Sequence, residues 1–196
     1  GQELLLSICE DTLNTLDPRD ALVLDTHELG RRAGAMLKRS FTAPAPADLG
    51  SEVIGIPEGS DLELNLRLES VVEGVLVSGE VTAKTTGMCS RCLTDIAQDL
   101  TVDFQELYEY ADDDNSSSED EDLLQLEGDL LNLEPVVRDA LVLALPLAPL
   151  CDDECLGLCP ECGIELNKEP NHEHEIVDSR WQALQGLLTE NDPKEG

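Results

Sequence analysis

Four cysteines near the C-terminal end constrain this chain more than any other feature of its sequence. They lie in the segment Cys151-Asp-Asp-Glu-Cys-Leu-Gly-Leu-Cys-Pro-Glu-Cys-Gly163. A structural zinc ion takes four thiolate or imidazole ligands in a tetrahedron, and cysteine pairs separated by two or three residues let a turn wrap one ion. The spacing therefore predicts a zinc knuckle with the ligands Cys151, Cys155, Cys159 and Cys162.

The part Cys159-Pro-Glu-Cys162-Gly163 is the most specific. Pro160 fixes a φ angle that suits the turn, and Gly163 tolerates the backbone conformation that brings N–H groups near a sulfur. Three other uses of the sulfurs stay open: a redox pair, an iron–sulfur cluster and free thiols. A thioredoxin-like redox pair belongs at a helix N-terminus, whereas an extended segment follows here, and the spacing differs from the common ferredoxin pattern.

Four further residues are candidate metal ligands: Cys89, Cys92, His172 and His174. Two arrangements remain open. Either the four C-terminal cysteines close one local site, or Cys89 and Cys92 join Cys159 and Cys162 and tie the sheet to the tail. The two histidines either supply imidazole ligands or are solvated. The remaining cysteine, Cys9, is expected to be a core or half-buried thiol.

The candidate ligand sets leave zinc no open coordination position. The sequence also lacks a His-Glu-x-x-His pair, a Gly-rich phosphate loop and a Gly-x-Ser-x-Gly elbow. Catalytic zinc needs an open position and a general base nearby. We therefore expect that the protein is not an enzyme.

The charge of the chain is strongly negative and unevenly distributed. It has 12 Lys+Arg against 43 Asp+Glu, a net charge of -31, and no Lys or Arg lies between Arg91 and Arg138. Such a surface either only keeps the protein soluble or favours basic partners. An early basic patch is predicted to contact a partner such as rRNA: Arg31, Arg32, Lys38 and Arg39. Aromatic residues make up 3% of the chain, too few for a platform that stacks bases.

The cellular location is inferred from three features. No stretch reaches the roughly 18 apolar residues that span a bilayer, and the first residues lack the features of a signal peptide. The cysteine count is odd and most cysteines fall into close pairs, which favours metal binding in a reducing compartment. We expect a cytoplasmic protein without a membrane partner.

Strand periodicity is clearest in the middle of the chain. Leucines alternate with polar residues over 62–68, and the alternation recurs over 75–83 and 100–110, with a turn at Glu73-Gly74. The short connections favour an antiparallel meander, with Cys89 and Cys92 at the second turn. Before it, we expect a short strand over 21–24, a helix or irregular arm over 28–38 and an extended connector over 42–48.

Residues 111–122 are acidic and polar, which predicts a disordered loop that is either a spacer or a docking segment for a basic partner. Apolar stripes predict a helix over 135–145 and a shorter one over 178–188, which either docks on the sheet or binds a partner. The fold class is therefore α+β: an antiparallel β-sheet or partly closed barrel with a few helices and a C-terminal zinc knuckle. We expect four segments packed as one domain: 1–60 (strand/helix and connector), 61–110 (sheet core), 111–129 (acidic loop) and 130–190 (helix, knuckle and C-terminal helix).

Several motifs occur in an order that resembles the YceD family, the large ribosomal RNA subunit accumulation proteins. The motifs are Val77-Ser-Gly-Glu-Val-Thr-Ala83, Cys89-Ser-Arg-Cys92-Leu93, Leu143-Ala-Leu-Pro146, the cysteine-rich segment, Leu166-Asn167 and Asp178-Ser-Arg180. Many relatives carry Cys-x-Cys at the position of His172-Glu-His174, a difference that preserves the capacity to bind a metal. The resemblance implies a cytosolic, non-enzymatic factor that supports large-subunit rRNA accumulation and ribosome assembly.

This resemblance leads to a hypothesis about partners. The acidic region would hold a basic ribosomal protein or a pre-ribosomal particle, and the early basic patch would contact rRNA. One alternative is a zinc-stabilised interaction or regulatory module without a ribosomal role. Another is an rRNA-processing nuclease, which no carboxylate cluster in the sequence favours.

Overall fold

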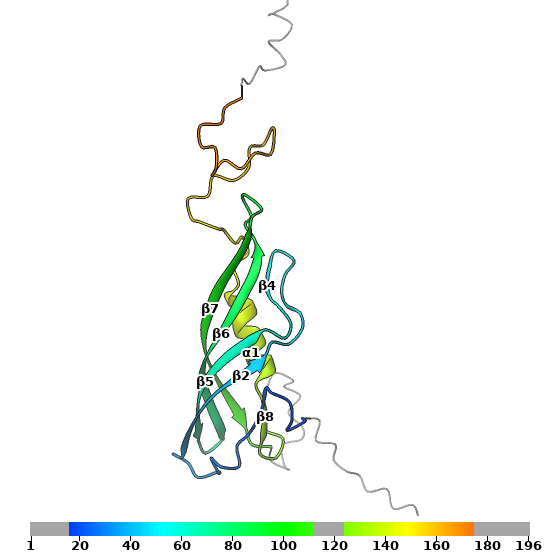
Figure 1. Ribbon diagram of the computed structural model, residues 1–196. Coiled ribbons are helices and arrows are strands. Elements are labelled where there is room, and N and C mark those ends of the chain that lie inside the picture. Colours follow the sequence, from blue (N-terminus) through cyan, green and yellow to red (C-terminus); the bar gives the residue numbers. More distant parts are fainter. Residues whose placement is uncertain (1–15, 112–123, 175–196) are drawn as a thin grey trace, which may run out of the picture.

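The computed structural model describes residues 16–111 and 124–174 and contains one α-helix and two sheets within them (Figure 1). The strands are β1 (Val23–Asp25), β2 (Met36–Pro44), β3 (Leu49–Gly50), β4 (Ile54–Ile56), β5 (Asp61–Ser70), β6 (Gly74–Met88), β7 (Asp95–Glu109) and β8 (Leu130–Asn132). The helix is α1 (Glu134–Ala144). The fold is α+β, as the sequence predicts.

The main sheet has six strands and is antiparallel throughout. β2 pairs with β5, β5 with β6, and β6 with both β4 and β7, while β3 pairs with β4. The predicted alternation on β5 is confirmed, because Leu62, Leu64, Leu66 and Leu68 are all buried. The sheet is open: in the described part of the chain β2 and β7 do not pair, so the alternative of a partly closed barrel is wrong.

The β6–β7 hairpin is the longest element of the molecule. Its two strands pair over their full length, from Gly74 opposite Glu109 to Met88 opposite Asp95. β7 therefore begins earlier than the predicted residue 100, because β6 offers a continuous partner that compensates for the polar start of β7. The turn beyond Met88 contains Cys89 and Cys92, as expected.

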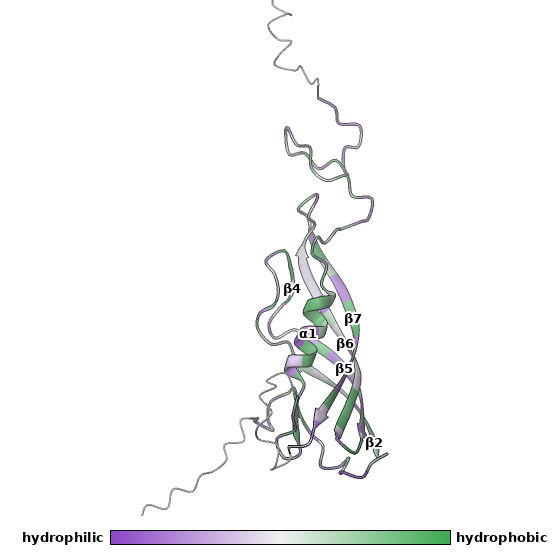
Figure 2. Ribbon diagram, turned by 180° about the vertical axis from the view of Figure 1, so that it is seen from behind, coloured by the Kyte–Doolittle hydropathy of each residue, from purple (hydrophilic) through white to green (hydrophobic). Residues whose placement is uncertain are grey.

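Helix α1 covers one face of the sheet, where it packs mainly on β7 and β3 (Figure 2). Pro135 occupies its first turn, where a missing N–H costs nothing. Val136, Val137 and Leu141 on α1 are buried and join the core formed by β5 and β6. The predicted helix over 135–145 is thus confirmed within one residue at each end.

Core residues come from segments far apart in sequence. Leu22, before β1, belongs to the same core as the strands and α1, and β1 pairs with β8. Tyr108 is buried on β7 and donates a hydrogen bond from its hydroxyl to the carbonyl of Asn132 at 2.7 Å. This contact ties the long hairpin to the residues that precede α1.

The molecule is elongated (Figure 1). Its sheet and helix form a body from which the tip of the β6–β7 hairpin extends at one end; the chain after α1 runs to that tip, where Pro149 contacts Ser90, and the tail continues beyond it. β8 lies towards the opposite end. The cysteine-rich tail is therefore placed next to the hairpin tip and away from most of the core.

Two sequence expectations differ from the structure. Residues 28–35 form turns, with positive φ at Gly30 and Gly34, so there the irregular arm is confirmed and the helix is wrong, and strand β2 already starts at Met36. In the expected acidic loop, residues 124–129 hold bridges, with Gln125 opposite Glu109 and Glu127 opposite Leu130. Residues 112–123, Cys9 and the predicted helix over 178–188 lie outside the described residues. In the described ranges, no helix combines the length and the apolar character needed to cross a membrane.

Candidate metal centre

The hairpin tip forms a compact knuckle around Cys89 and Cys92. The N–H of Cys89 donates to the carbonyl of Thr94 at 2.8 Å, and the N–H of Leu93 donates to the carbonyl of Cys89 at 2.9 Å. Leu93 closes the turn with a φ of 60°, a region that residues with a side chain rarely adopt. These bonds hold both sulfurs on the inside of the turn.

The tail repeats the same knuckle at Cys159 and Cys162. Here the N–H of Cys159 donates to the carbonyl of Ile164 at 2.8 Å, and the N–H of Gly163 donates to the carbonyl of Cys159 at 2.9 Å. Gly163 has a φ of 75° and meets no costly contact there, because it lacks a Cβ. The sequence reading of this segment as a knuckle closed by Gly163 agrees with the geometry.

The first group of candidate ligands joins the hairpin tip to the start of the tail. Its four sulfurs, from Cys89, Cys92, Cys151 and Cys155, lie within 4.8 Å of one another. The sulfurs of Cys89 and Cys155 are 3.8 Å apart and those of Cys92 and Cys151 are 3.5 Å apart. A zinc tetrahedron with bonds of about 2.3 Å has sulfur–sulfur edges of about 3.8 Å, so the four sulfurs fit such an ion.

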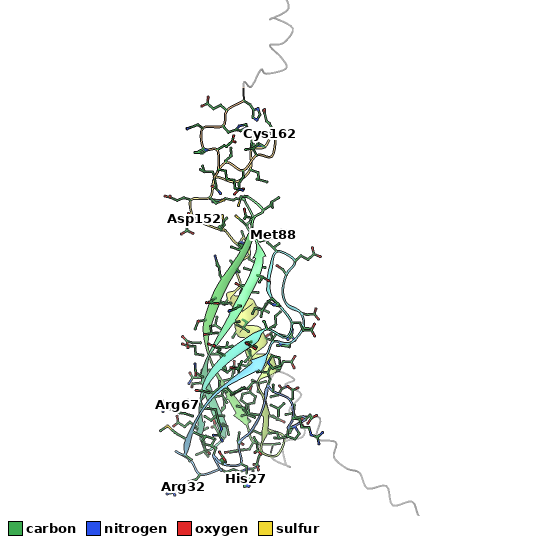
Figure 3. The ribbon with its side chains drawn as sticks, in the orientation of Figure 1. His27, Arg32, Arg67, Met88, Asp152 and Cys162 are labelled. Carbon is green, nitrogen blue, oxygen red and sulfur yellow. The ribbon has the colours of Figure 1, made fainter. Side chains whose placement is uncertain are left out.

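The second group lies within the tail. It contains the sulfurs of Cys159 and Cys162 and the ring nitrogens of His172 and His174, again within 4.8 Å of one another. The Nε2 atoms of the histidines are 2.8 Å apart, and each lies 3.1 Å from the sulfur of Cys162. Both rings thus direct Nε2 to one point, an arrangement typical of imidazoles around a shared cation. Figure 3 shows Cys162 in this distal part of the molecule.

The histidines also have carboxylates behind them. Nδ1 of His172 lies 3.9 Å from Glu169, and Nδ1 of His174 lies 3.9 Å from Glu161. At 3.9 Å neither carboxylate is within hydrogen-bond distance of its ring. The case for the histidines as ligands rather than solvated side chains therefore rests on the convergence of their Nε2 atoms beside the sulfur of Cys162.

The pKa values of the cysteines follow from their hydrogen bonds. The backbone N–H of Cys92 and further N–H groups lower the pKa of Cys89 to about 6, although burial opposes the shift. The backbone N–H of Cys162 likewise lowers the pKa of Cys159 to about 6. These thiols are therefore prepared to lose a proton and bind a cation.

Cys151 shows the opposite shift. Hydrogen bonding to the sulfur of Cys92, and then to that of Cys155, raises the pKa of Cys151 to about 12. Four sulfurs so close together cannot all carry charge unless a cation balances them, and Cys151 therefore keeps its proton. A divalent cation at the centre would remove this repulsion and displace the proton.

The cysteines of the two groups do not form disulfide bonds. The sulfur–sulfur distances of 3.5 and 3.8 Å exceed the bond length of about 2.05 Å, and the described cysteines are free. In these two groups, the residues present could hold one metal ion each.

Neither of the two arrangements expected from the sequence matches these groups. Cys151 and Cys155 do not share a site with Cys159 and Cys162, and Cys89 and Cys92 pair with the former rather than the latter. The reason is the chain path after α1. The N–H of Ser90 donates to the carbonyl of Pro149 at 2.8 Å, which brings the start of the tail against the hairpin tip.

Two supporting residues were quoted from the sequence only as parts of family motifs, without a role at the metal. Asn167 donates from Nδ2 to the sulfur of Cys155 at 3.2 Å and accepts from the N–H of Leu156 at 2.8 Å. Arg91 donates to the carbonyl of Cys155 at 3.0 Å. The signals for them were the position of Arg91 inside a Cys-x-x-Cys turn and the place of Asn167 in the motif Leu166-Asn167.

The four basic residues expected to form a patch do not all face one side of the sheet. Lys38 and Arg39 are adjacent on β2 and so point to opposite faces of the sheet. Arg39 pairs with Glu28, and the guanidinium of Arg31 lies over the ring of Tyr110 at 4.7 Å. Arg32 lies at the end of the molecule opposite Cys162 (Figure 3).

Comparison with known proteins identifies the relatives of this chain. An uncharacterized protein of Mycobacterium tuberculosis strain H37Rv is 42% identical over 168 residues, which cover 85% of this chain and 81% of that protein. An uncharacterized protein of Mycobacterium leprae is 38% identical over 174 residues, 88% of this chain and 80% of that protein. The uncharacterized protein YlbN of Bacillus subtilis is 29% identical over 119 residues, 59% of this chain and 65% of that protein.

No significant match was found among solved structures. The family model "Large ribosomal RNA subunit accumulation protein YceD" matches residues 77–188, a range that includes β7, α1 and both groups of candidate ligands. That range is more than half of the chain, and its motifs are the ones quoted above. The chain therefore belongs to the YceD family of large ribosomal RNA subunit accumulation proteins.

Proposed function

We propose that this protein is a non-enzymatic, cytoplasmic factor that supports large-subunit rRNA accumulation by binding a basic ribosomal protein or a pre-ribosomal particle. The observation that carries the proposal is the family match over residues 77–188. The free, closely grouped cysteines suit a reducing compartment, in which thiols serve metals rather than disulfides.

We further propose that both groups of candidate ligands bind zinc. The first offers four thiolates and the second two thiolates and two imidazoles, the donor sets of structural zinc sites. Each set fills a tetrahedron with protein atoms, which leaves no position for a substrate or an activated water. The metals would thus stabilise the tail and its attachment to the hairpin rather than catalyse a reaction.

The charge of the sheet supports a basic partner. Five acidic residues and no basic ones lie on β7, and the whole interval from Arg91 to Arg138 lacks Lys and Arg. Such a surface attracts basic proteins and repels bare phosphate backbones. Lys38 and Arg39 point to opposite faces of the sheet, and Arg39 is paired with Glu28, so we place the main contact on a protein component rather than on rRNA.

Two measurements test this proposal. Elemental analysis of protein purified without added metal should find two equivalents of zinc, and two equivalents of iron would contradict the zinc assignment. Affinity purification of the tagged protein from its own cells, at low and moderate salt, should enrich a large-subunit ribosomal protein or pre-ribosomal particle. Enrichment of transcription regulators without ribosomal components would instead support a regulatory module.

A further inference from the structure

Strand β7 forms an open edge of the main sheet. It pairs with β6 on one side, and in the described residues its other side is engaged only at the end, where Glu109 bridges Gln125. At that end the N–H of Glu109 donates to the carbonyl of Leu124, and its carbonyl accepts from the N–H of Leu126. The edge of β7 therefore already receives a short extended segment.

The geometry of a strand fixes which other groups point the same way. Backbone N–H and C=O groups alternate between the two sides of an antiparallel strand. Since the backbone N–H and C=O of Glu109 point away from β6, so do the backbone groups of the odd-numbered residues before it, among them Thr101, Asp103 and Gln105. Within the described part of the chain, the backbone groups of these residues have no partner on the outer side. An exposed row of this kind is a template for a further strand.

A groove runs beside this edge, between β7 and helix α1. It has a volume of about 400 Å³. Its apolar lining comes from Phe104 of β7, from Leu124 of the segment that meets the edge, and from α1, where it includes Val136, Ala140 and Leu143. Leu143 is 85% exposed, an unusual exposure for a leucine that lines a groove.

The rim of the groove is acidic. Glu106 from β7 and Asp139 from α1 line it, and Asp103 lies on the opposite face of β7. None of these carboxylates is in an ion pair with a described residue. The surroundings thus combine three features: free backbone groups, an apolar floor and uncompensated negative charge.

We infer that the β7 edge and α1 form a docking groove for an extended, lysine- or arginine-rich segment of a partner protein. The segment would add a strand to β7 through main-chain hydrogen bonds, place alternate apolar side chains into the groove and direct the basic side chains between them to the opposite face, where Asp103 lies. The inference rests on the proposed function in one respect, since that function requires a basic partner. Beyond that function, it specifies where the partner binds and that the bound segment is an extended strand.

The direct test uses the full-length wild-type protein and a fluorescein-labelled peptide, Lys-Val-Lys-Val-Lys-Val-Lys-Val, with binding followed by fluorescence anisotropy. Two further peptides are methylated on the backbone nitrogens of either the odd or the even residues. Only one alternate set of N–H groups can face β7, so one methylated peptide should bind like the parent and the other at least tenfold more weakly. Equal binding of the two methylated peptides, or no saturable binding of the parent, overturns the inference. The matching peptide with Glu in place of Lys should not bind.

A variant of the edge gives a second test. Gln105→Pro removes an outward N–H without breaking the ladder to β6, whereas Gln105→Ala keeps that N–H and loses the same side chain. Peptide binding should weaken at least tenfold in the first variant and less than twofold in the second. Metal content and thermal unfolding of both variants, matched to wild type, show that the fold is retained.

The two variants also separate this inference from the proposed function. If wild type and Gln105→Pro capture the same pre-ribosomal material equally, the function stands and the docking groove is wrong. If the peptide binds as expected but no ribosomal material is captured, the groove stands and the function is wrong. Concentration-dependent dimers of wild type that Gln105→Pro abolishes, seen by sedimentation velocity, would assign the edge to a second copy of this chain and overturn the inference.

Discussion

The two groups of candidate ligands share one backbone knuckle and differ in almost everything else. In the first group, Cys89, Cys92 and Cys155 are buried, and the ligands come from two segments that are 59 residues apart. In the second group, Cys162 is exposed, and the four ligands come from one short segment, with the histidines 10 and 12 residues after Cys162. The same local motif therefore serves a long-range connection in one place and a local one in the other.

This difference shows what a metal can contribute to stability in each place. Closing a long loop removes more conformational entropy from the unfolded chain than closing a short one. An ion in the first group would hold the tail against the hairpin tip, whereas an ion in the second would order only residues around Cys159 and His174. The comparison leads to four predictions, in decreasing order of effect.

Replacing Cys155 with serine should have the largest effect. The variant should lose one of two metal equivalents, and its free energy of unfolding should fall by about 4 kcal/mol, the closure term for a loop of this length. Elemental analysis and urea unfolding of the same preparation would measure both. Retention of two equivalents would show that the first group does not hold an ion.

Replacing Cys162 with serine should lower the metal content without lowering the stability of the sheet. This variant should also lose one equivalent, but the unfolding midpoint of the sheet should stay within the error of the wild-type value, because the lost ion orders only the tail. Circular dichroism in the β region, followed through a thermal scan, reports on the sheet. A loss of sheet stability as large as that of the Cys155 variant would break the distinction between the two groups.

Replacing Asn167 with alanine should weaken the first ion without removing a ligand. The side chain donates to the sulfur of Cys155, and loss of such a supporting contact typically costs 10- to 100-fold in metal affinity. Competition with a chromophoric chelator would resolve one weakened and one unchanged ion. Asn167→Asp is the control that keeps the acceptor for Leu156, and it should weaken the same ion at least as much, since a carboxylate repels the thiolate.

Exchanging the residues that close the knuckles should have the smallest effect. A residue with a side chain in the left-handed region costs about 1 kcal/mol or somewhat more, so Gly163→Leu should lower the affinity of the second ion roughly fivefold or more. Leu93→Gly should raise the affinity of the first ion by less, because glycine also gains entropy in the unfolded chain. The same chelator competition measures both, and a gain in affinity for Gly163→Leu would contradict the strain argument.

The strength of the local pattern decided how much of the fold could be predicted. On β5 every second residue is a leucine and the other face is polar, so the strand and its buried face follow directly. On β2 the alternation is interrupted by Arg39, which lies on the same face as Leu37 and Phe41 and pairs with Glu28. Because of this interruption, the sequence did not predict strand β2, and it therefore did not show that Lys38 and Arg39 point to opposite faces of the sheet.

The candidate metal site was likewise predictable only in part. Local spacing was enough to identify all eight candidate ligands, because each knuckle is formed by a short turn. Their distribution between two ions depends on where the chain goes after α1, which is set by contacts such as that between Ser90 and Pro149. Contacts between segments this far apart leave no periodic signal in one sequence.

The span between Cys92 and Cys151 has a topological consequence. When the four sulfurs of the first group share an ion, the chain between these two residues becomes a closed ring. That ring contains β7 and α1, and therefore both walls of the groove beside the sheet edge. β7 would be connected to the ion through the hairpin tip, and α1 would be connected to it through the short segment between α1 and Cys151. An ion bound there would hold the two ends of this ring together and so limit how far the two walls of the groove can move apart.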